Sequence, residues 1–70
     1  MVARHSEAQM LREAQQFARD YNLSIRERTV NGTTTYFAWR RIAGHTDVFL
    51  FKTTRVATLR ARIERAAIAH

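Results

Sequence analysis

The N-terminal part of the chain shows apolar residues at intervals of three and four, the spacing of an amphipathic helix. Ser6 followed by Gln9 matches a capping box, so we expect a helix over residues 6–21. Its buried stripe would consist of Met10, Leu11, Ala14, Phe17, Ala18 and Tyr21. The opposite side, with Arg12, Glu13, Gln16, Arg19 and Asp20, is interpreted as solvated surface, and Asn22 is a residue type that ends helices.

After Asn22 the pattern changes to the alternation of apolar and polar residues that is typical of strands. One strand ends before Asn31-Gly32, the strongest short-range signal for a two-residue hairpin turn. A second strand rich in β-branched and aromatic residues follows, a break falls at residues 43–46, and a third strand runs from Val48 to Lys52. The pattern predicts an antiparallel three-stranded meander over residues 23–52.

The C-terminal part returns to helical spacing. Thr53 or Thr54 can cap a helix over residues 54–68. Its buried stripe would consist of Val56, Leu59, Ile63, Ala66 and Ala67. The chain therefore predicts an α+β fold with the order α-β-β-β-α, a single small domain over residues 1–70 with a ragged N-terminus over residues 1–5, and both helices packed on one face of the sheet.

The turn lengths predict the strand register, and with it the two faces of the sheet. The expected cross-strand partners are Ile25–Ala38, Arg26–Phe37 and Glu27–Tyr36 in the first hairpin, and Ile42–Asp47, Arg40–Phe49 and Ala38–Phe51 in the second. The core face then carries Leu23, Ile25, Tyr36, Ala38, Ile42, Phe49 and Phe51. The other face carries Arg26, Arg28, Phe37, Trp39, Arg41, Val48, Leu50 and Lys52, and no helix remains to cover it.

Charge indicates what kind of partner this uncovered face would meet. The chain has 12 Lys and Arg against 6 Asp and Glu, a formal net charge of +6. Eleven of the cations are arginine, which binds phosphates with a planar, two-pronged fork. A surplus of arginine favours a polyanionic partner, although arginine-rich usage also follows from a genome of high GC content.

Other classes of function find little support in the sequence. The chain has no cysteine, which excludes disulfides, thiolate metal sites and a cysteine nucleophile. His5, His45 and His70 are dispersed, Asp47 is the one nearby carboxylate, and no glycine-rich phosphate loop is present. No apolar run reaches the roughly 18 residues of a membrane helix, and residues 1–5 lack the apolar core of a signal peptide. We expect a cytoplasmic, non-enzymatic protein that uses no metal, small-molecule cofactor or membrane.

The leading hypothesis is a small basic protein that binds nucleic acid, with DNA favoured over RNA, through the uncovered sheet face. The candidate binding residues are Arg26, Arg28, Phe37, Trp39, Arg41 and Lys52. A secondary basic stripe on the last helix comprises Arg55, Arg62 and Arg65.

Two other interpretations of the same face stay open. Phe37, Trp39, Val48 and Leu50 could form the seam of a homodimer or bind a protein partner, as in a compact inhibitor or adaptor of phage or mobile-element type. Alternatively, Phe37 and Trp39 belong to the core and the register differs by one residue.

Residues 24–68 resemble the sheet-type DNA-binding domains of the plant AP2 class and the arm-binding domains of tyrosine integrases. Arg26 and Arg28 on the first strand, Trp39 and Arg41 on the second, and Phe51-Lys52-Thr53 before the helix carry the resemblance. It implies that the strand residues lie in the major groove of DNA. Asp47-Val48-Phe49-Leu50 stands where those families have a glycine before a leucine, and the N-terminal helix is an addition.

The order of elements is also similar to the double-stranded RNA-binding domain. That resemblance implies contacts to duplex RNA from the first helix, a loop between strands and the N-terminus of the last helix, with Arg55, Arg62 and Arg65 on the phosphates. Lys52 and Arg55 lie near the basic motif that precedes the last helix of the family. The histidine-bearing loop motif of the family is missing.

Overall fold

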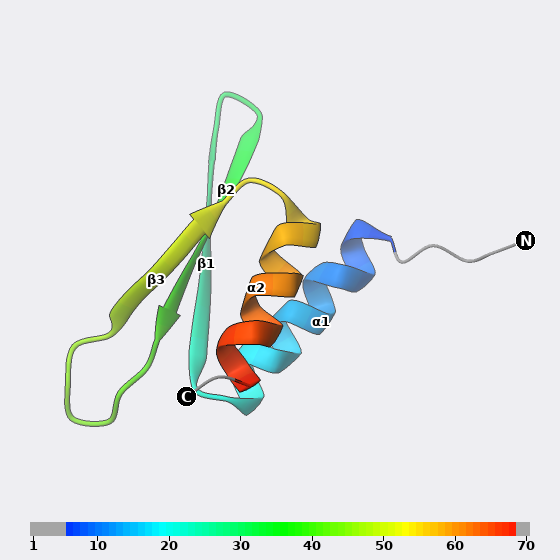
Figure 1. The fold of residues 1–70 in the computed structure, drawn as a ribbon. Coiled ribbons are helices and arrows are strands. Elements are labelled where there is room, and N and C mark those ends of the chain that lie inside the picture. The colour runs from blue at the N-terminus through cyan, green and yellow to red at the C-terminus, as the bar shows by residue number, and fades with distance from the viewer. Residues whose placement is uncertain (1–5, 69–70) are drawn as a thin grey trace, which may run out of the picture.

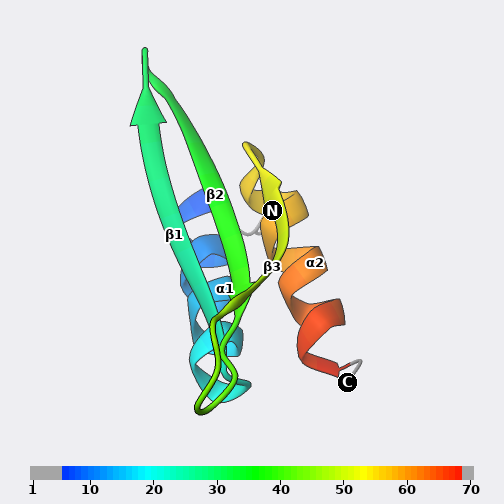
Figure 2. The same ribbon diagram turned by 90° about the vertical axis from the view of Figure 1, so that its left-hand side faces the viewer.

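The fold consists of two helices on one side of a three-stranded sheet (Figure 1, Figure 2). The computed structural model describes residues 6–68. Its elements are α1 (Glu7–Asp20), β1 (Leu23–Val30), β2 (Thr33–Arg40), β3 (Val48–Thr53) and α2 (Val56–Ile68). The strands pair antiparallel in the order β1-β2-β3. The predicted fold class is confirmed, and the expectations for residues 1–5 and His70 lie outside the described residues.

Helix α1 begins and ends close to its predicted limits. The backbone N–H of Gln9 donates to Ser6 Oγ at 3.1 Å, which is one half of a capping box. The Gln9 amide points instead to Glu13, at 3.5 Å, so the reciprocal half is absent. The helix is followed by Tyr21 and by Asn22, whose φ of 59° is the left-handed conformation common after helices. Tyr21 is 47% exposed and is not part of the core, contrary to prediction.

Helix α2 starts two residues later than predicted, at Val56. The Arg55 N–H donates to Thr53 Oγ1 at 3.1 Å, and the Leu59 N–H donates to the Arg55 carbonyl at 2.9 Å. Thr53 therefore ends β3 and stabilises the turn into the helix, and the predicted threonine cap is wrong because Arg55 occupies the position before the first helical residue.

The core lies between the helices and one face of the sheet. Its buried members are Ala14, Ala18, Leu23, Tyr36, Ala38, Phe51, Val56, Leu59, Ile63 and Ala67, with Ile25, Leu50 and Ala66 partly buried against them. The predicted stripe of α2 is thus confirmed. Alanines at contact positions of α1 and β2 let the elements approach closely, so the larger Leu59 and Ile63 fill the space between them completely.

The first hairpin has the predicted register, with Ile25 opposite Ala38 and Arg26 opposite Phe37. Asn31 and Gly32 have φ values of 52° and 79°. Positive φ at both central residues defines the type I′ turn, whose twist matches that of the strands. This turn fixes which side chains of β1 and β2 share a face.

The second hairpin departs from the predicted register. Ala38 faces Phe51 as expected, but Trp39 faces Phe49, and the ladder shifts between Ala38 and Trp39. Leu50 is the extra residue of a β-bulge, which reverses the facing of the residues that precede it on β3. The connection between β2 and β3 spans residues 41–47 and is longer than predicted.

The bulge exchanges two side chains between the core and the surface. Phe49, predicted in the core, is 46% exposed, whereas Leu50, predicted on the uncovered face, packs against the core. Val48, also predicted on the uncovered face, pairs with Arg40 and so shares the side of Leu23. Ile42, predicted in the core, is 40% exposed because it lies beyond the end of β2. Phe37 and Trp39 stay on the uncovered side, as their pairing with Arg26 and Ser24 shows. The alternative in which these two rings are core residues is therefore wrong.

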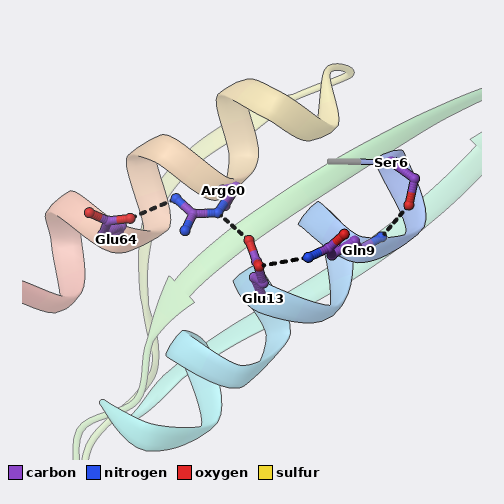
Figure 3. Close-up of polar contacts among 5 residues, drawn as sticks. All are labelled: Ser6, Gln9, Glu13, Arg60 and Glu64. Atoms are coloured by element: carbon purple, nitrogen blue, oxygen red, sulfur yellow. Dashed lines mark hydrogen bonds and ion pairs between the residues drawn. The ribbon is translucent and has the colours of Figure 1, made fainter. Parts of the chain in front are cut away.

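Polar contacts tie the two helices to each other (Figure 3). Arg60 on α2 binds Glu13 on α1 at 2.6 Å and Glu64 at 2.7 Å. The hydrogen bond to Glu13, and then that to Glu64, raises the pKa of Arg60 above its usual value. Glu13 was predicted to be solvated surface, and this prediction is wrong because Glu13 forms an ion pair between the two helices. At the end of β2, Arg40 donates to the carbonyl of Ala66 at 3.1 Å.

Candidate nucleic-acid interface

The sheet side away from the helices, here called the open face, stays uncovered (Figure 2). Alternation along the paired strands assigns its residues. They are Ser24, Arg26, Arg28, Val30, Thr33, Thr35, Phe37, Trp39, Phe49 and Lys52. None of these open-face residues is acidic, so Arg26, Arg28 and Lys52 give the surface a positive potential.

Two rows of side chains cross the open face from strand to strand. In the first row, Phe37 on β2 lies between Arg26 on β1 and Lys52 on β3. Both cations are exposed and the ring is half-buried. Neighbouring strands are about 4.8 Å apart. A ligand that contacts the Phe37 ring is therefore within reach of the Arg26 and Lys52 side chains.

The second row brings Trp39 and Phe49 together. Their ring centroids are 5.1 Å apart and their planes meet at 67°, the edge-to-face geometry that aromatic pairs favour. Phe49 is 46% exposed while Trp39 is half-buried. The Trp39 Nε1–H is covered and, within residues 6–68, has no hydrogen-bond partner. This row makes one end of the open face apolar.

A hollow of about 480 Å³ lies at the other end of the open face. It exists because β3 ends at Thr53, opposite Tyr36, while β2 begins three residues earlier. Its lining includes Arg28, Thr35, Phe37, Lys52 and Thr54. The hollow thus places two cations and several hydroxyl groups beside an aromatic side chain.

Arg41 does not join the other predicted binding residues. It follows the end of β2, and its backbone N–H donates to the Asn22 carbonyl at 2.8 Å. It lines a hollow with Arg19 and Leu23, at the corner where α1 meets β1. The structure therefore gathers Arg26, Arg28, Phe37, Trp39 and Lys52 on one surface and separates Arg41 from them.

The predicted basic stripe is also separate from the open face, because α2 lies on the opposite side of the sheet (Figure 2). The guanidinium of Arg62 lies 4.4 Å from the ring centroid of Phe51 and forms a cation–π contact. This contact accounts for the position of the Arg62 side chain without any bound ligand. Arg65 lines a hollow with Glu64 and Ile68, and Arg55 lies in the turn before the helix.

His45 and Asp47 lie in the connection between β2 and β3. The His45 N–H donates to the Ile42 carbonyl at 3.0 Å, and Gly44 between them has a φ of 77°. This positive φ at the third residue is that of a type II turn. Over residues 6–68, no cluster of three or more His, Asp or Glu side chains could hold a metal ion, and neither described helix is long and apolar enough to cross a bilayer.

Sequence reasoning missed Phe49 as a member of this surface, because a bulge leaves no mark in an apolar run such as Val48–Phe51. It also missed the hollow, since the relative lengths of β2 and β3 were not predictable at that precision. No protein-family model matches the chain, and neither does any curated protein or solved structure.

Proposed function

We propose that this protein is a small, non-enzymatic nucleic-acid-binding protein that uses its open face, with DNA preferred over RNA. The observation that carries the proposal is the Arg26–Phe37–Lys52 row, in which two exposed cations flank an accessible ring. Cations neutralise phosphates and rings contact bases or sugars, so one row supplies both kinds of contact. The preference for DNA rests on the resemblance to sheet-type DNA-binding domains.

The distribution of charged residues favours the open face over the helical side as the surface that binds nucleic acid. Arg28 adds a third cation, and no acidic side chain stands among the open-face residues. By contrast, the helical side mixes cations such as Arg62 and Arg65 with Glu13 and Glu64, which pair with Arg60. A polyanion that approaches the open face therefore meets the more uniform positive potential.

A second candidate function uses the apolar end of the same face. Phe49 is 46% exposed beside Trp39, and such rings serve as anchors in protein interfaces. A compact inhibitor or adaptor of phage or mobile-element type, or a homodimer, would bury this end. Binding would then depend on the rings and respond little to salt.

The test is fluorescence anisotropy with labelled 20-nucleotide DNA and RNA of one mixed sequence, each single-stranded and duplex. The variant R26E/R28E reverses two charges on the open face. The matched control R12E/R19E makes the same change of net charge at two exposed positions of α1. Circular dichroism confirms that both variants stay folded.

We expect wild type and R12E/R19E to bind DNA alike, and R26E/R28E to bind at least about tenfold more weakly. Equal losses in both variants would show that net charge alone drives binding and would overturn the proposed surface. If no nucleic acid binds and the protein elutes as a dimer that W39A dissociates, the second candidate function replaces the first.

A further inference from the structure

The arrangement of rings on the open face indicates which form of nucleic acid fits it. Phe37 and Trp39 are two residues apart on β2 and point to the same side. At about 3.4 Å per residue their side chains leave the strand about 7 Å apart. Bases in a B-form strand are stacked about 3.4 Å apart, so the rings are spaced at twice the interval of stacked bases.

Stacking on the rings requires bases whose faces are free. In a duplex each base covers the faces of its neighbours, and the grooves present base edges, namely polar groups and the thymine methyl group. Phe37 and Trp39 could then contact base edges and sugars but not the faces of the bases. Unpaired bases can separate, and each can stack on its own ring.

The hollow beside Phe37 has a lining that suits one nucleotide unit. Phe37 forms part of its wall, while Arg28 and Lys52 contribute cations and Thr53 and Thr54 contribute hydroxyl groups. A base that stacks on the ring would therefore place its phosphate near two positive charges.

We infer that the open face binds single-stranded nucleic acid, with one unpaired base stacked on Phe37 and the adjoining phosphate held by Arg28 and Lys52. This inference rests on the proposed function, because it names the form of nucleic acid that the same face takes. It departs from the duplex major-groove contacts that the resemblance to sheet-type DNA-binding domains implies. The Trp39–Phe49 pair then lies at the next position along the bound strand.

The experiment compares single strand and duplex in anisotropy titrations at one salt concentration. The probes are a labelled mixed-sequence 12-nucleotide DNA alone and annealed to its complement. The variant F37L removes the ring and keeps an apolar side chain, and F37Y keeps the ring. The control Y21L removes an aromatic ring that is 47% exposed at the end of α1.

We expect the single strand to bind at least about tenfold more tightly than the duplex. Loss of one stacked base corresponds to a roughly 5- to 150-fold weaker affinity for F37L, while F37Y and Y21L bind like wild type. The single tryptophan of the chain is Trp39, so its emission should change as unlabelled single strand is added and stay constant with duplex.

Two results would overturn the inference in distinguishable ways. Duplex binding that equals or exceeds single-strand binding, with F37L unchanged, would refute the single-strand inference and leave the proposed function in place. Absence of binding to either probe would refute both.

Discussion

The number of cations on the open face sets how strongly salt should weaken DNA binding. Three exposed cations, Arg26, Arg28 and Lys52, can neutralise three phosphates. Each neutralised phosphate contributes about −0.7 to the slope of log affinity against log salt for a single strand, so we expect a slope of about −2.1. Between 50 and 200 mM salt this slope corresponds to a roughly 18-fold rise in Kd.

Neutral variants turn this estimate into a test of the individual residues. The double variant R26Q/R28Q leaves one cation, so the slope should fall to about −0.7 and the rise in Kd over the same salt range to roughly 2.6-fold. The control R12Q/R19Q, with the same loss of charge on α1, should keep the wild-type slope. Anisotropy titrations at four salt concentrations measure these slopes.

A wild-type slope near zero would refute phosphate binding. A slope near −5 would mean that cations outside the open face, such as Arg62 and Arg65 on α2, also contact the strand. Either result, or a slope that R26Q/R28Q leaves unchanged, would contradict the assignment of the interface to the open face.

Three further predictions concern the fold that presents this face. Arg40→Met removes a charge-assisted hydrogen bond to the last turn of α2 and should lower the free energy of unfolding in urea by about 1.5–3 kcal/mol; an unchanged midpoint would contradict this role. In a double-mutant cycle, Glu13→Gln and Arg60→Gln should each destabilise the fold, and the double variant should lose less than the sum; additive effects would show that the ion pair contributes nothing. Leu50→Ala should cost about 1–2 kcal/mol because this side chain is partly buried, whereas Phe49→Ala should cost less than about 1 kcal/mol; the reverse order would mean that β3 has the register without a bulge.

The first hairpin could be predicted from the sequence because its determinants are local. Asn31-Gly32 takes up the two positive φ values of a type I′ turn, and the turn then fixes every partner from Ile25–Ala38 to Val30–Thr33. This register alone predicted that Phe37 and Trp39 face away from the helices and that Tyr36 faces them.

The second hairpin could not be predicted because its determinants are not local. Seven residues connect β2 and β3, and a loop of that length leaves the register free. The bulge at Leu50 is set by packing, since it lets Leu50 and the adjoining Phe51 both reach the core while Phe49 pairs with Trp39. Alternation alone assigns Phe49 and Leu50 to the wrong faces.

Among the candidate site residues, those within the regular strands kept their predicted places and those at the ends did not. Arg26, Arg28 and Lys52 share the open face because the pleat repeats every two residues. Arg41 lies beyond the last residue of β2, where the pleat no longer directs the side chain. The contact between Glu13 and Arg60 joins two helices far apart in sequence and has no local signal.

The most direct test of the open face as the binding surface is a heteronuclear NMR titration of the labelled protein with the 12-nucleotide single strand. We expect the largest amide shifts at Arg26, Phe37 and Lys52, together with a shift of the Trp39 indole N–H. Shifts confined to α2 around Arg62 and Arg65, with the β2 amides unmoved, would contradict the assignment.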